Sequence, residues 1–359
     1  MKHCLNLAIG VFLILTSLTV QAQESKLDSG QSYRLLDTVK VSTMQTELEQ
    51  SAAAGYRVRA GLGRNILLLE KAPAPPAHYE YALPDTNEKS LNEAGASGFR
   101  LLPQPVGMNK GTSGLFGGFS RGFAGLVMEK QPGSETSYEY KILATTRTST
   151  MEKELAEASQ QGYQIVAITK SDPLDTGSGE HMLILEKGSE MPAKTSDLHE
   201  DGSADAMVDR YRLLSTTKTS TMQEELDEAA AAGYRVLDAS DSELAIALKK
   251  APEGEIPRKY LLLSTGRTST MQKELNEGAR NGFRLLPQTL GAIEKKPMGG
   301  LFGSVQTEIF ATMEKTPSSN SRYEYILLAT KRSSTMEKEV AEASQKGLRS
   351  CYPDPQLHR

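Results

Sequence analysis

The sequence predicts an α+β protein: a tandem array of six β-α-β-β units with sheet order 1-3-2 and one helix each, the sixth unit being truncated. Three observations lead to this fold class. One pattern of residues recurs six times, each copy contains an amphipathic helix with start and stop signals, and runs with strand periodicity flank that helix. The predicted repeats span 33–73, 78–132, 137–188, 209–252, 258–317 and 322–359.

The six copies form two blocks of three. "AAAGYRV" occurs in the first and fourth copies, "GFRLLPQ" in the second and fifth, and "TMEKE" in the third and sixth. A block of three units was therefore duplicated. The polar, acidic stretch 189–208 is the expected linker between the blocks. The copies begin near Tyr33, Tyr79, Tyr138, Tyr211, Tyr260 and Tyr323.

The helix of the third unit shows its signals most clearly. Ser149 and Glu152 have the spacing of a capping box, which makes Ser149 the expected N-cap. Met151 begins an apolar stripe, and Gly162 supplies the left-handed residue that ends a helix. The same cap pair is expected at Ser42/Gln45, Ser220/Gln223, Ser269/Gln272 and Ser334/Glu337, and the same stop at Gly55, Gly98, Gly233, Gly282 and Gly347.

The runs on either side of each helix are strands. "YEYKI" and "YRVRA" alternate with period two, and the last run of a unit, such as "NILLLEK", is nearly all apolar, which suits a strand between two neighbours. A right-handed crossover joins the first two strands, and the third pairs antiparallel between them. A unit of roughly 45 residues is too small to be stable alone, so neighbouring units must share their sheets, edge to edge or face to face.

The sixth unit departs abruptly from the third. Residues 138–162 and 323–347 match at 19 of 25 positions, and the next nine positions match at none. We interpret the change after Gly347 as a frameshift, and the alternative is that the truncation is native. Leu348 to Arg359 should not form a strand, and Gln23 to Ser32 are too polar to replace it. The helix stripe at Met336 would then lack a sheet, and this unit should be the least ordered unless it borrows a neighbour's sheet.

Residues 1–22 have the pattern of a signal peptide. A polar start precedes "LAIGVFLIL", and "VQA" places small residues before Gln23. The alternative is a membrane anchor, although the apolar stretch is shorter than the ~20 residues of a spanning helix. We therefore expect a periplasmic or secreted protein without a transmembrane span after leader removal. Of the two cysteines, Cys4 lies in the expected leader and Cys351 in the C-terminal tail, so the body of the mature chain has no disulfide framework.

The recurring Tyr-x-Tyr strand, the helix with "ELxEAxxxG", the Gly-Tyr stop and the final "LEK" strand resemble a family of small bacterial β-α-β-β domains of unknown function. Members of that family often carry Gly-Trp where this chain has Gly-Tyr or Gly-Phe, and the chain contains no Trp. The resemblance covers most of each unit. It implies the fold and a bacterial source, and it implies no particular activity.

Catalytic and metal-binding patterns are weak in this sequence. His78, His181, His199 and His358 are scattered without ligand spacing, and the best pair is His181 beside Glu180. No nucleophile elbow, phosphate loop or dinucleotide fingerprint occurs. We expect no catalytic residue, no cofactor and no metal. The net charge of −4 argues against nucleic-acid binding, although tyrosines such as Tyr138 and Tyr140 could stack on bases.

The strongest candidate site is the turn between the first strand and the helix. "TTRTSTM" and its copies place a basic residue and several hydroxyls before a helix N-terminus, where free N–H groups favour an anion. The purely structural alternative is that Ser caps the helix and Thr favours the strand. The candidate anion-binding residues are Arg147, Ser149, Lys218, Ser220, Arg267, Ser269, Arg332 and Ser334.

Two function classes follow. The first is an exported, non-enzymatic repeat protein with a binding or structural role, whose partner is an envelope protein, a glycan or a small anion. The second is an exported enzyme with its site in the Gly-rich loops "GLFGG" (114–118) and "GGLFG" (299–303), which could instead pack against a neighbouring unit. The first class predicts no cleft in which His, Asp or Glu, and Ser converge at hydrogen-bonding distance, and one such cleft would overturn it in favour of the enzyme.

Overall fold

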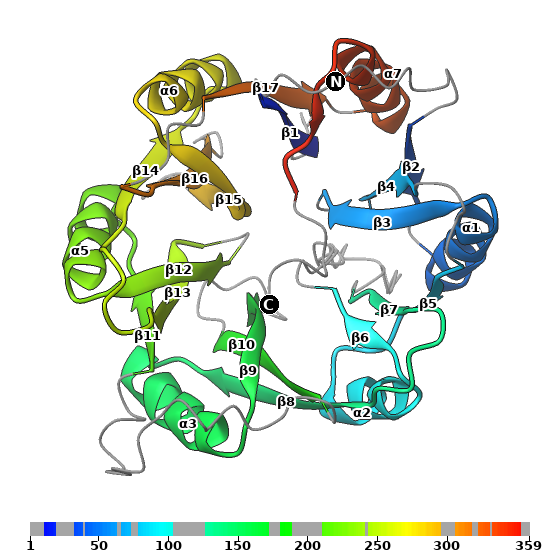
Figure 1. Cartoon of the computed structure of the whole chain (residues 1–359), viewed down its shortest axis with the longest axis horizontal. Coiled ribbons are helices and arrows are strands. Elements are labelled where there is room, and N and C mark those ends of the chain that lie inside the picture. The colour runs from blue at the N-terminus through cyan, green and yellow to red at the C-terminus, as the bar shows by residue number, and fades with distance from the viewer. Residues whose placement is uncertain are drawn as a thin grey trace, which may run out of the picture.

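The six units close into a ring (Figure 1). Helices lie around the rim and the sheets point inward. The structure is a computed structural model, and it describes residues 11–18, 32–38, 40–62, 66–72, 78–102, 126–171, 180–188, 210–240, 243–295, 306–317, 322–330 and 332–352.

The predicted unit is confirmed. Five three-stranded sheets have the order 1-3-2, with the third strand antiparallel to both neighbours. Units 1 to 3 consist of β2 (Tyr33–Asp37), α1 (Val41–Ala53), β3 (Tyr56–Gly61) and β4 (Ile66–Lys71); β5 (Glu80–Ala82), α2 (Glu88–Ala96), β6 (Arg100–Leu101) and β7 (Met128–Lys130); and β8 (Tyr138–Thr145), α3 (Thr148–Gln160), β9 (Gln164–Ser171) and β10 (Glu180–Gly188).

Units 4 and 5 repeat the same plan, and unit 6 varies it. Their elements are β11 (Tyr211–Ser215), α5 (Thr219–Ala231), β12 (Tyr234–Ala239) and β13 (Ala245–Lys250); β14 (Lys259–Thr265), α6 (Thr268–Arg280), β15 (Arg284–Lys295) and β16 (Gln306–Lys315); and β17 (Tyr323–Thr330), α7 (Ser333–Gln345) and β18 (Arg349–Ser350). The central strand of the sixth sheet is β1 (Val11–Leu18), from the opposite end of the chain.

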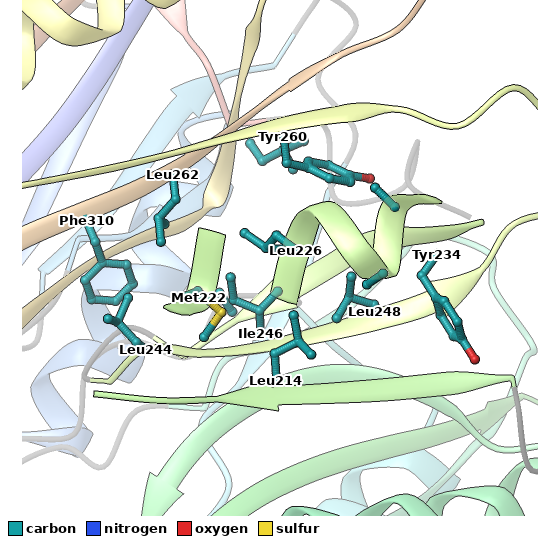
Figure 2. Packing of buried hydrophobic residues seen from close by; sticks show 14 residues of the cluster. Leu214, Met222, Leu226, Tyr234, Leu244, Ile246, Leu248, Tyr260, Leu262 and Phe310 are labelled. Carbon is teal, nitrogen blue, oxygen red and sulfur yellow. The ribbon is translucent and has the colours of Figure 1, made fainter. Parts of the chain in front are cut away.

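Each hydrophobic core lies between two consecutive units, including the sixth and the first. In the core of unit 4, Met222 and Leu226 of α5 lie among residues of their own sheet, such as Ile246, and among Tyr260 and Phe310 of unit 5 (Figure 2). A helix therefore packs against its own sheet on one side and against the next unit's sheet on the other. The units share their cores face to face, which satisfies the need for burial that a single small unit cannot meet.

The predicted helix starts are wrong, and the predicted stops are confirmed. Arg147 is the N-cap of α3 and makes no side-chain cap bond, so Ser149 lies inside the first turn. The same holds for α1, α5, α6 and α7, whose N-caps are Lys40, Lys218, Arg267 and Arg332. The hydroxyl that orders the turn belongs to the preceding strand, because Thr145 Oγ1 accepts from the Arg147 amide at 3.2 Å. At the other end, Gly162 has φ 91°, and Tyr163 N donates to Ala158 O as in a Schellman stop.

The Gln and Glu residues of the expected capping boxes bind the neighbouring unit instead. Glu152 accepts from the Leu213 amide at 3.0 Å, and Gln272 donates to Tyr325 O at 2.6 Å. Each reaches the free edge of the next unit's first strand, whose backbone groups would otherwise lack partners. Gln45, Gln223 and Glu337 do the same, and Glu337 joins unit 6 to unit 1 through the Leu35 amide.

The expectations for the sixth unit are corrected in two respects. Arg349 and Ser350 pair with β1, so the start of the tail forms a short strand. The helix stripe is also covered, since Met336 and Val340 are buried beside Leu68 of unit 1. The strand that completes this sheet, β1, lies upstream of Gln23 to Ser32, in the segment expected to be the leader.

Candidate functional site

One set of polar contacts recurs at the interfaces of the ring. A tyrosine of the first strand accepts a hydrogen bond from a second-strand amide of the preceding unit, as Tyr140 does from Leu101 at 2.8 Å. The corresponding pairs are Val58 and Tyr81, Val236 and Tyr260, Leu285 and Tyr325, and Ser350 and Tyr33. The last pair joins unit 6 to unit 1, so the ring closes with the same contact that joins its other units.

Two interfaces add a buried ion pair to this contact. Arg57 of β3 binds Glu129 of the next unit with two donors, at 2.8 and 3.0 Å, and both side chains are almost fully buried. Arg100 of β6 binds Glu186 of β10 with two nitrogens on one oxygen, Oε1, both at 2.8 Å, and Tyr140 donates to the other carboxylate oxygen at 2.9 Å. The bidentate Arg57 pair has strict geometry, so it adds directional specificity to the contact between units 1 and 2.

Burial controls the protonation of this network. It raises the pKa of Glu186 to about 7, while the Arg100 guanidinium and the Tyr140 hydroxyl act in the opposite direction. Burial and the Glu186 carboxylate also raise the pKa of Tyr140 well above its ordinary value. Tyr140 therefore keeps its proton at neutral pH, and its hydroxyl can donate a hydrogen bond to the Glu186 carboxylate.

The interface between units 3 and 4 breaks the pattern. Gln164 occupies the position of the arginine, and Lys249 occupies that of the glutamate, opposite Tyr211. Burial lowers the pKa of Lys249, and Arg210 and Arg235 lower it further. Tyr211 keeps the backbone contact of the pattern, to Ile165, although without the geometry of a full hydrogen bond.

The same interface brings a serine, a histidine and a glutamate together. His181 Nδ1 lies 2.7 Å from Glu243 Oε1, and His181 Nε2 lies 3.4 Å from Ser215 Oγ. The histidine and the glutamate are mostly buried, whereas Ser215 is exposed. With the proton on Nδ1, the imidazole donates to Glu243 and can accept from Ser215. The order of groups is that of a catalytic triad.

Unit 5 holds the same serine and glutamate without the histidine. Ser264 and Glu308 occupy the positions of Ser215 and Glu243, and Ser264 donates directly to Glu308 at 2.5 Å. The serine–glutamate pair therefore occurs in both unit 4 and unit 5, and His181 of unit 3 inserts between its members in unit 4. The carboxylate that contacts His181 in the structure is that of Glu243, from unit 4. The sequence offered no signal for the pairing, because Ser215 and Glu243 are ordinary strand-end residues until the units are superposed.

The predicted anion-binding residues lie at four separate turns, one in each of units 3 to 6. Arg147, Lys218, Arg267 and Arg332 are exposed N-cap residues, and the four serines are exposed in the first turn of each helix. The fold thus repeats one basic turn around the rim and does not gather the four into one pocket. Anion binding there stays a prediction.

Several other expectations lie partly or wholly outside the described residues: the Gly-rich loops 114–118 and 299–303, the linker 189–208, and His199 and His358. Within the ranges given above, no group of three or more His, Cys, Asp or Glu side chains is arranged to hold a metal ion. Among the helices that the structure describes, none is long and apolar enough to cross a membrane.

Comparison with known proteins provides no relative from which a function could be transferred. No family model matches the chain, and no curated protein or solved structure matches it either. The assignment of function must therefore start from the ring and its interfaces.

Proposed function

We propose that the protein is an exported ring that acts by binding or as a structural element, with anions or acidic glycans held at the basic turns of its helices. The observation that carries this proposal is the repetition of one exposed basic turn in four consecutive units of a closed ring. The pattern of residues 1–22 supports export to the periplasm or beyond.

Repetition makes a polymeric anion the best ligand class. A single exposed helix N-terminus with one cation gives weak binding, because water and salt screen it. Several equivalent turns on one rigid body can hold successive groups of one chain, and the second contact then forms at high effective concentration. A sulfated or uronic-acid glycan has this repeating charge.

The test compares a monomeric with a polymeric anion. Dextran sulfate should raise the melting temperature by several degrees at concentrations where inorganic sulfate has no effect, since bound ligand stabilises the folded state. The variant Arg147→Ala with Arg332→Ala should lose most of that rise. The matched control is Lys153→Ala with Lys338→Ala, which removes the same charge from the exposed faces of the same two helices, α3 and α7. If both double variants lose the same part of the rise in melting temperature, the rise depends only on net charge, and the turns are rejected as binding sites.

A second candidate function is acyl transfer at Ser215, favoured by the Ser215–His181–Glu243 arrangement. Ser215 Oγ would attack an ester carbonyl while its proton passes to His181 Nε2, and Glu243 would stabilise the imidazolium at Nδ1. The leaving alkoxide would take that proton, and water would hydrolyse the acyl-enzyme. This candidate ranks second because Ser264 and Glu308 form the same pair without a histidine.

Unit 5 provides the control for this candidate. A fluorophosphonate probe should label Ser215 and leave Ser264 unlabelled, and Ser215→Ala should abolish the label. His181→Gln should reduce the labelling rate at least tenfold, because the serine loses its base. Labelling of both serines at the same slow rate, or an unchanged rate in His181→Gln, would exclude an activated nucleophile.

A further inference from the structure

The sixth sheet takes its central strand from outside its own unit. In the other five sheets the central strand follows the second strand of the same unit. In the sixth, β1 lies between β17 and β18, with Val11 opposite Thr330 and Leu18 opposite Tyr323. The sixth unit therefore has a defined place for an added strand, with backbone groups to pair on both sides.

Unit 3 shows what this place is built to hold. Its first strand, "YEYKILAT", is nearly the same as "YEYILLAT" of β17. Its central strand β10 pairs in the same register over eight positions, His181 to Gly188. Aligned by that register, Leu183-Ile184-Leu185 of β10 corresponds to the identical triplet Leu13-Ile14-Leu15 of β1. The next position differs, since Glu186 corresponds to Thr16.

That difference removes a carboxylate from the interface between units 5 and 6. In units 1 and 2 the second-strand arginine reaches past its own sheet to the next unit's glutamate, as Arg100 does to Glu186. The equivalent residue of unit 5, Arg284, instead pairs with Glu314 of its own sheet, and its side chain is 49% exposed, compared with 17% for Arg100. Arg349 also lies opposite Thr16. Arg349 thus lies opposite a threonine at the position where units 1, 2, 3 and 5 carry a glutamate. Arg284 occupies the place from which Arg57 and Arg100 bind the glutamate of the next unit.

We propose that the position between β17 and β18 is a strand-acceptor site, and that its occupant in the processed protein is a strand of another polypeptide with an apolar centre and a carboxylate opposite Tyr325. The backbone edges of β17 and β18 supply affinity, and the two arginines supply selectivity for the carboxylate. The inference rests on the proposed export, because removal of residues 1–22 also removes β1.

The binding test uses the full chain with Ile14→Pro, since proline in a central strand removes a ladder hydrogen bond and disfavours pairing. The probe is a labelled peptide with the sequence of 181–188, "HMLILEKG", and its control carries Gln in place of the Glu. The variant should bind the Glu peptide at least tenfold more tightly than the Gln peptide, and Arg284→Ala should cancel the difference. The unaltered chain should bind neither peptide, because β1 fills the site. Equal affinity of Ile14→Pro for both peptides would reject the carboxylate preference.

A second measurement covers the case in which Ile14→Pro fails to fold. In the otherwise unaltered chain, Thr16→Glu should raise the melting temperature, Thr16→Gln should not, and the rise should disappear in Arg284→Ala. No rise with Thr16→Glu would overturn the proposal. Export is tested separately by the N-terminus of the protein recovered from the periplasm or medium. A recovered chain that starts at Met1 refutes export and leaves the acceptor site to be decided by the Ile14→Pro and Thr16 variants, whereas one that starts at Gln23 and does not bind the Glu peptide refutes the site alone.

Discussion

The interface between units 2 and 3 and the interface between units 5 and 6 occupy equivalent places in the two duplicated blocks. Both keep the backbone amide-to-tyrosine bond, Leu101 to Tyr140 and Leu285 to Tyr325. Only the first has a carboxylate beneath the tyrosine, Glu186, which binds both Tyr140 and Arg100. The difference shows that the repeated backbone contact is sufficient to place the units in the ring, and that the buried charge is an addition to it.

The largest expected effect comes from breaking the buried pair between units 2 and 3. Glu186→Leu leaves Arg100 buried without its carboxylate and should lower the free energy of unfolding by about 3–5 kcal/mol. Urea unfolding at pH 8 measures it, since Glu186 is then ionised.

The double variant Arg100→Leu with Glu186→Leu should recover much of that loss, because a buried pair contributes little beyond an apolar replacement. The corresponding variant between units 5 and 6, Arg284→Leu, should cost far less, since that side chain is half exposed and pairs within its own sheet. Equal losses for Glu186→Leu and Arg284→Leu would remove the distinction drawn between the two interfaces.

A smaller effect is expected from pH at the same glutamate. Its pKa rises from 4.5 in the unfolded chain to about 7 in the ring, chiefly through burial. Between these values the folded state holds the proton more strongly than the unfolded state, so stability falls as pH rises from 4.5 to 7 and is level above 7. At ~1.4 kcal/mol per pKa unit, the full change is on the order of 3 kcal/mol.

Glu186→Gln should remove this part of the pH dependence, because the amide does not titrate. The matched replacement Glu70→Gln, in unit 1, should leave it unchanged, since Glu70 is only partly buried. A pH dependence over the window from 4.5 to 7 that Glu186→Gln leaves unchanged would contradict the raised pKa of Glu186.

The fold could be predicted because its signals are local and repeated. Alternating strands, an apolar helix stripe and a glycine such as Gly162 each follow from a few neighbouring residues, and six copies confirm one another. Closure of the ring could not be predicted in this way. Glu152 has the spacing of a capping-box residue, yet it binds the edge of the next unit, and that edge exists only after the units have packed.

The contacts at the candidate sites depend on still longer separations. The apolar run that reads as a leader also reads as a strand, and its partner Tyr325 is some three hundred positions away. His181 meets Ser215 and Glu243 across an interface between the two blocks, so no spacing within one unit marks them. The basic turns could be predicted because each is a short pattern of neighbouring residues. Such a pattern does not show where the turns lie relative to one another, so the sequence could not show that the fold keeps the four turns apart.

The smallest expected effects come from replacing the tyrosines of the two interfaces, between units 2 and 3 and between units 5 and 6. These replacements separate the amide-to-tyrosine bond, which both interfaces have, from the bond to Glu186, which only the first has. Tyr325→Phe removes the acceptor of the Leu285 amide and leaves that buried donor unsatisfied, which should cost about 1–3 kcal/mol. Tyr140→Phe removes the same kind of bond to Leu101 and also the hydroxyl that donates to Glu186, so its cost should be the greater of the two. In a Glu186→Gln background the two tyrosine substitutions should lower the free energy of unfolding by nearly equal amounts, because the charged acceptor has gone.

Urea unfolding of the five variants and the unaltered chain measures these free energies. If Tyr140→Phe stays costlier than Tyr325→Phe in that background, the surplus belongs to packing around Tyr140 and not to its bond with the carboxylate.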